Sequence, residues 1–213
     1  MTPLTWDQAR ALGEHLAGET SAVVTSHDDG AMAVAGTLLR TLAAMVKGAG
    51  PVVDLVLARG ERTSVTLPTP LGTIVVLARA ASASPVAYAR TITHEAVHAG
   101  QVQRLGGLQA SVDYLGSGEL RAVREADAYA AGLWTEFLLT GELPSPDPAL
   151  VSIAGGLYHL DAEDIALARA VVVSHLTTIR AGLCPPLAVA QSTLRWLHAN
   201  APEALAIEPG DAP

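Results

Sequence analysis

The chain of 213 residues has a single cysteine and a shortage of basic residues, and each scarcity excludes a class of protein. Because Cys184 has no partner for an intrachain disulfide, the sequence predicts a protein of the reducing cytosol. Thirteen Lys and Arg against 21 Asp and Glu give a formal net charge of -8, and no basic cluster is present. We therefore expect no nucleic-acid partner.

Long apolar runs are also missing. The most apolar window, residues 31–46, is shorter than the roughly 20 residues that a membrane-spanning helix needs, and it contains Arg40. The first residues show no basic region followed by an apolar stretch, so no secretory signal is expected. The sequence therefore predicts a cytoplasmic protein without a membrane partner.

Aromatic residues make up only 4% of the chain, although half of all residues are hydrophobic. The core is therefore expected to consist of Ala, Leu and Val side chains, which favours close-packed helices. A chain of this length can bury one sizeable core without a disulfide.

The pattern of apolar residues, caps and breakers predicts a mainly helical α+β fold. Helices are expected over about 5–17, 31–47, 86–105, 119–140, 149–158, 162–181 and 186–199. Short β-branched runs between Gly and Pro predict strands over 52–57, 64–67 and 73–77, which would form a small, largely antiparallel sheet of about three strands.

Prolines at 144, 146 and 148 mark the one boundary that the composition indicates. We expect a zincin-like domain over 1–143, with its core at about 52–140, for the reasons given below. A helical segment over 144–201 should pack on this core, and a flexible tail should occupy 202–213.

Residues 93–98 read Thr-His-Glu-Ala-Val-His and place a His-Glu-x-x-His motif inside a predicted helix. Positions four apart share one helix face, so the imidazoles of His94 and His98 can reach one metal ion. Zinc suits two neutral imidazoles and one carboxylate, and leaves a fourth position for water. Glu95 is placed to take a proton from that water as general base. The motif therefore predicts one Zn²⁺ per chain.

A third ligand must come from another segment. The metzincin pattern is excluded because Gln101 and Arg104 stand where it would have a glycine and a histidine. A carboxylate on the next predicted helix remains. The candidates are Glu119, Glu125 and Asp127.

The motif after a short sheet, followed by Glu-Ala-Asp-Ala-Tyr-Ala at residues 125–130, resembles the zincins whose third ligand is a glutamate. Within them it is similar to the small ImmA/IrrE-like metallopeptidases, over about residues 52–140. The resemblance implies a zincin-like fold, Glu125 as third zinc ligand and Asp127 as a supporting or alternative carboxylate. Such relatives often carry another acid two positions before the glutamate, where this chain has Val123.

Zincins commonly use a side-chain donor to stabilise the oxyanion that forms on the attacked carbonyl. The candidates in the distal predicted helices are Tyr158, His159 and His175. Tyr114 and Tyr129 are also considered, and Tyr129 is expected to pack beneath the ligand helix.

The ligand imidazoles need partners for their second ring nitrogens. Gln101, one helical turn after His98, and Asp113 are the candidates for this role.

The leading hypothesis is a zinc-dependent metallohydrolase, first of all a peptidase acting on a peptide or protein substrate. A second hypothesis is a zincin-like module that binds zinc for interaction or sensing and cuts little. A third is a helical interaction protein in which the motif is accidental. Glu95 favours the first, because a structural zinc site needs no base and fills its fourth position with protein. The composition suits a bacterial or phage protein, and the sequence does not predict an oligomeric state.

Overall fold

The computed structural model describes the greater part of the chain. The described residues are 2–26, 37, 40–41, 64–69, 72–154 and 160–207. Over these ranges the chain is mainly helical with a small three-stranded sheet, so the predicted α+β, mainly α, class is confirmed. The strand predicted over 52–57 lies outside the described residues, as does the helix predicted over 31–47 apart from residues 37 and 40–41.

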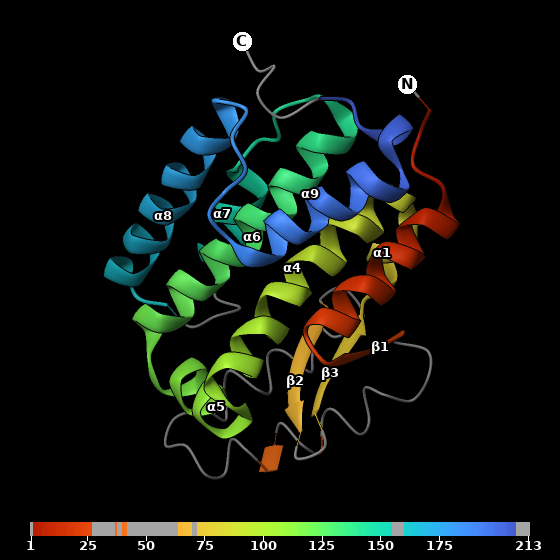
Figure 1. Ribbon diagram of the computed structural model, residues 1–213. Coiled ribbons are helices and arrows are strands. Elements are labelled where there is room, and N and C mark those ends of the chain that lie inside the picture. Colours follow the sequence, from red (N-terminus) through yellow and green to blue (C-terminus); the bar gives the residue numbers. More distant parts are fainter. Residues whose placement is uncertain are drawn as a thin grey trace.

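Seven α-helices lie in the described ranges (Figure 1). They are α1 (Trp6–Glu19), α4 (Pro85–Leu105), α5 (Gly107–Gly116), α6 (Gly118–Thr140), α7 (Asp147–Ala154), α8 (Ala162–Arg180) and α9 (Ala188–Asn200). There are also two short 3-10 helices in these ranges. Helix η2 (Arg79–Ala83) precedes α4, and η3 (Pro202–Ala204) follows α9. None of the described helices combines the length and the apolar character that crossing a membrane requires.

Helix α5 has no counterpart among the predicted helices. The pair Gly106 and Gly107 indicates a helix end, and α4 does end there, with Gly106 at φ 78° and its N–H bonded to the Val102 carbonyl. The chain then re-enters a helix at once, because Gly106 is also the residue that precedes α5. A glycine that closes one helix and opens the next carries no sequence signal for the second.

The sheet contains β1 (Ala22–Ser26), β2 (Val65–Thr69) and β3 (Gly72–Leu77) in the order β1-β3-β2. Strand β2 runs antiparallel to β3, but β1 runs parallel to it, so the expectation of a largely antiparallel sheet is corrected to a mixed one. Strand β1 is not predicted from the sequence, because this short run follows α1 directly, through a turn at Ser21 with φ 52°.

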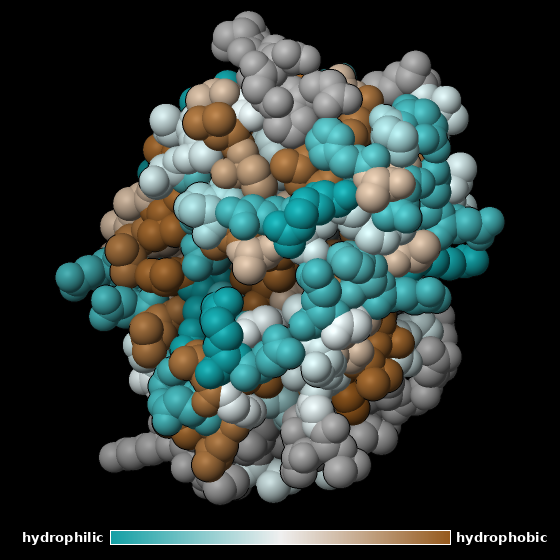
Figure 2. All heavy atoms as spheres, viewed as in Figure 1, coloured by the Kyte–Doolittle hydropathy of each residue, from teal (hydrophilic) through white to brown (hydrophobic). Residues whose placement is uncertain are grey.

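Helix α4 occupies the centre of the molecule and contacts both β2 and β3 as well as α1, α5, α6 and α9. Figure 1 shows α1 and α4 lying over the sheet, with α6 beside α4 and α8 on the outside. The outer surface of α1 and α9 is mostly hydrophilic in Figure 2, whereas Leu12, Leu16 and Leu197 on their inner sides are fully buried. These are amphipathic helices around an aliphatic core, as the composition predicts.

The segment that follows the proline-rich stretch contacts the first part of the chain. Helix α8 packs on α6, and α9 packs on α1, α4 and α6. Residues 202–207 of the predicted tail pack on the core, since Ala204 is buried and the Ala206 N–H donates to the Leu138 carbonyl, and residues 208–213 lie outside the described residues. The Thr2 N–H likewise donates to the Glu203 carbonyl.

A glycine sets the close approach of α4 and α6. A Cβ added at Gly132 would lie 3.2 Å from the Arg90 carbonyl oxygen and 3.8 Å from the Cβ of His94. Larger side chains at this position would therefore separate the two helices next to the first histidine of the motif.

Gly132→Val should lower the free energy of unfolding of the metal-free protein by about 1–3 kcal/mol, because the added methyl groups meet backbone of α4. Gly18→Val is the matched control, since a Cβ at Gly18, also in a helix, meets nothing within 4 Å. Urea unfolding followed by circular dichroism measures both. Equal midpoints for the two variants would contradict the close-approach argument.

Candidate metal centre

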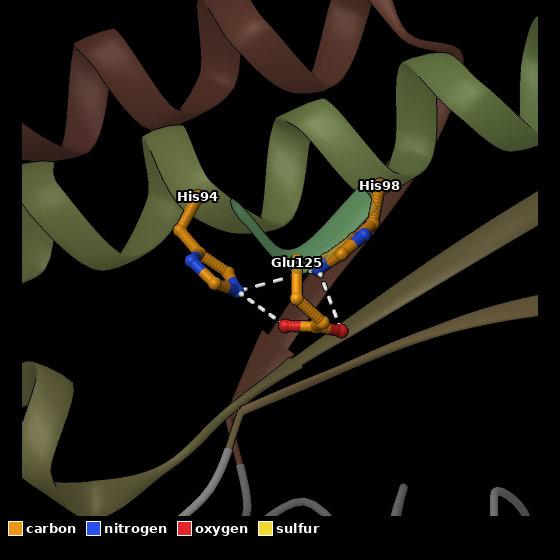
Figure 3. Close-up of side chains that lie close together, drawn as sticks. All are labelled: His94, His98 and Glu125. Carbon is orange, nitrogen blue, oxygen red and sulfur yellow. Dashed lines mark hydrogen bonds and ion pairs between the residues drawn. The ribbon is translucent and has the colours of Figure 1, made fainter. Parts of the chain in front are cut away.

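Helices α4 and α6 bring three potential metal ligands together (Figure 3). Ser84 caps the start of α4 by accepting a hydrogen bond from the Ala87 N–H, and the helix then carries His94 and His98 on one face. Helix α6 supplies Glu125, whose carboxylate points at both imidazoles in Figure 3. Sequence spacing predicted the two histidines, and the family resemblance pointed to this glutamate.

The donor atoms have the separations of a metal site. The Nε2 atoms of His94 and His98 are 3.3 Å apart. Glu125 places Oε1 3.4 Å from Nε2 of His98 and Oε2 3.7 Å from Nε2 of His94. Ligands of a tetrahedral Zn²⁺ with Zn–N bonds of about 2.0–2.1 Å lie about 3.3 Å from one another. The three residues therefore could hold one metal ion.

The carboxylate itself lacks a full set of partners. Glu125 is 2% exposed, and its Oε2 atom is buried without a hydrogen-bond partner in the described structure. A buried carboxylate oxygen without a partner is costly. A cation bound among the three residues would satisfy it, so the residues fit a metal ion in chemistry as well as in geometry.

Charges within the cluster are coupled in the metal-free protein. Burial alone would raise the pKa of Glu125, but the neighbouring His98 and His94 and the hydrogen bonds from His98 and Tyr114 lower it below its usual value. Burial opposes the charged form of His98, yet the Glu125 carboxylate outweighs it and raises the pKa of that imidazole. The pKa of His94 is lowered to about 3, mainly by burial and to a smaller extent by the charge of His98. A neutral His94 therefore stands beside an ion pair of His98 and Glu125.

Gln101 contacts the second ring nitrogen of His98, the role for which the sequence makes it a candidate. Its Oε1 atom is 3.2 Å from Nδ1 of His98. With Nδ1–H donated to this oxygen, Nε2 is the nitrogen that can lose its proton, and deprotonated His98 would direct the Nε2 lone pair at the site as a metal ligand must. Asp113, the other candidate for this task, is bonded instead to Arg124 and Gln109.

Glu95 lies beside the cluster and is only 4% exposed. Its Oε2 atom accepts a hydrogen bond of 2.7 Å from the Thr66 hydroxyl, which comes from β2. Burial raises the pKa of Glu95 to about 7, while His98 and the Thr66 hydrogen bond act in the opposite direction. Thr66 was not anticipated, because no local pattern shows that a strand threonine will face the motif.

A cleft of about 470 Å³ opens at His94 and Glu95. Most of its walls are small side chains from η2 and the residues that flank it, from α4 and from Gly132 of α6, and Tyr129 also lines it. The ring of Tyr129 packs edge-on against His94, with centroids 4.7 Å apart, in keeping with its expected place under the ligand helix. Arg90 and Glu136 form an ion pair of 2.8 Å in the cleft wall.

Other candidate residues lie elsewhere or outside the described ranges. Asp127 is bonded to His175 across α6 and α8, with Oδ1 2.9 Å from Nε2, and so neither residue joins the cluster of potential ligands. Glu119 is exposed in the first turn of α6. Tyr158 and His159 fall within residues 155–159, which the structure does not describe.

Glu125→Gln should weaken zinc binding by more than about 100-fold, because it removes a charged ligand from the cluster. Asp127→Asn is the matched control on the same helix and should bind one zinc per chain like the wild type, since Asp127 contacts His175 instead. Equilibrium dialysis with metal analysis gives both affinities. A loss of zinc with Asp127→Asn alone would assign the third ligand to Asp127.

Zinc binding at pH 7.5 should release about one proton per ion, because His98 carries a raised pKa in the metal-free protein and must lose its proton to become a ligand. The apparent affinity should therefore rise with pH and level off above the pKa of His98. Calorimetry in buffers of different ionisation enthalpy measures the release. Release near zero would mean that His98 is already neutral.

Comparison of the chain with protein-family models, with curated proteins and with solved structures finds no match. The positions of His94, His98 and Glu125 are therefore the observation that indicates a possible metal site.

Proposed function

We propose that the protein is a zinc-dependent metallopeptidase of the glutamate-ligand zincin type, similar to the ImmA/IrrE-like peptidases. The observation that carries the proposal is the joint position of His94, His98 and Glu125, together with a cleft that is lined by His94 and by the neighbouring Glu95. A structural zinc site would not require a carboxylate at this point, and it would not open into a cleft.

The donor set supports zinc as the metal. Two imidazoles and one carboxylate are the ligands of many catalytic zinc sites, and they leave one position open. The same set can hold other divalent ions, so zinc is part of the proposal. A bound Zn²⁺ would supply Lewis-acid chemistry, polarising a carbonyl and lowering the pKa of water.

The protein residues would then divide the remaining work. His94, His98 and Glu125 would hold the ion, and Gln101 would keep His98 in the required tautomer. Glu95 would accept the proton of the attacking water and pass it to the leaving nitrogen. Thr66 binds Oε2 of Glu95 and fixes the carboxylate in place, so Oε1 would serve for proton transfer.

The cleft supports a substrate larger than water. Its volume of about 470 Å³ lies within the range of sites for small molecules and short peptide segments. His94 and Glu95 both line it, so a carbonyl group bound there would lie beside one of the metal ligands and the base. The small side chains of its walls leave room for the side chains of a peptide.

Glu95→Gln should retain one zinc per chain and lose hydrolysis by about 10²–10⁴-fold, because the amide cannot accept the proton. The variant is close in size and preserves an oxygen for the Thr66 hydroxyl. Cleavage of a fluorogenic peptide library, measured beside zinc content, gives the result.

Full activity in the Glu95→Gln variant would contradict this mechanism. Stoichiometric zinc in the wild-type protein with no cleavage of any library member would favour the second hypothesis, a zinc-binding module for interaction or sensing. The zinc measurement separates these outcomes from simple loss of the site.

A further inference from the structure

Helix α5 is held firmly against the first turns of α6. The guanidinium of Arg124 donates to the Ala110 carbonyl at 3.1 Å and to the Asp113 carboxylate at 2.7 Å. The buried Arg121 donates to the Tyr114 carbonyl and lies over the Tyr114 ring at 5.9 Å. These two arginines of α6 therefore fix the position of α5, and of Tyr114 in particular.

Tyr114 reaches the metal centre through this arrangement. Its hydroxyl donates to Oε1 of Glu125 at 2.5 Å, and its ring lies edge-on to His98 with centroids 6.3 Å apart. The contact joins α5, which lies between the two ligand helices in sequence, to the carboxylate of α6.

The two oxygens of Glu125 thus have different surroundings. Oε1 is bonded to the tyrosine, whereas Oε2 is buried and has no hydrogen-bond partner in the described structure. Because an oxygen engaged by a strong donor is the poorer metal ligand, the vacant lone pairs of Oε2 are the ones available to a cation.

We propose that Tyr114 is a positioning residue, which holds Oε1 of Glu125 so that the glutamate binds the metal through Oε2 alone. The inference rests on the metal site proposed above. Single-oxygen ligation keeps the total at three protein donors and leaves a position for water, as catalytic zinc sites require. A glutamate released from Tyr114 would be able to turn both oxygens to the metal and fill that position.

Tyr114→Phe tests the proposal, because it removes the hydroxyl and preserves the ring beside Arg121 and His98. Zinc affinity should fall by about 10–100-fold with the stoichiometry unchanged. In Co²⁺-substituted protein the visible absorption should weaken, because five-coordinate cobalt absorbs less strongly than four-coordinate cobalt. The wild-type protein itself should give the intense four-coordinate spectrum.

Tyr88→Phe is the matched control, because Tyr88 lies on α4 like the histidines but packs edge-on against Trp6 of α1, away from the cluster of potential ligands. It should leave the zinc affinity and the cobalt spectrum unchanged. Thermal unfolding of the metal-free variants identifies any general loss of structure.

An unchanged spectrum and affinity in Tyr114→Phe would overturn the proposal, and so would a five-coordinate spectrum of wild-type protein. The wild-type spectrum needs no variant, so a five-coordinate result overturns the proposal even where Tyr114→Phe fails to fold. A wild type that binds neither zinc nor cobalt would instead refute the metal site on which the inference rests.

Discussion

The close packing of α4 on α6 is the constraint on which the site depends. The two histidines come from one helix, α4. The third ligand must come from α6 and still lie within coordination distance of the same metal position. Gly132 and the small residues around it allow this approach, since any larger side chain would meet the backbone of α4. Helices α1, α8 and α9 pack around the pair and hold it in place.

The centre is preorganised at an electrostatic cost. A buried carboxylate is unfavourable in an aliphatic core unless it is paired. Here the imidazoles and the Tyr114 hydroxyl contact the Glu125 carboxylate, and a bound cation would pair with it as well. The ion pair of Glu125 with His98 keeps the donors together before any metal binds. A cation that bound here would replace a proton at His98, so binding would need little rearrangement of the helices.

Sequence reasoning identified the parts of the site that depend on local periodicity. His94, His98 and Gln101 follow from one helix, and a family resemblance supplied Glu125, which the cluster contains. Thr66 was not anticipated, and Tyr114 was considered only as an oxyanion donor, because their contacts with Glu95 and Glu125 leave no spacing to recognise in the sequence. The same holds for β1 and α5, whose short runs follow a helix end directly. Asp127 and His175 have residue types suited to the site, but they contact each other and do not join the cluster of potential ligands.

X-ray diffraction from zinc-loaded crystals at the zinc absorption edge tests the central claim most directly. We expect one anomalous peak per chain, at about 2.0–2.2 Å from Nε2 of His94, Nε2 of His98 and an oxygen of Glu125. A peak bound by other residues, or no peak in protein folded as described, would contradict the account.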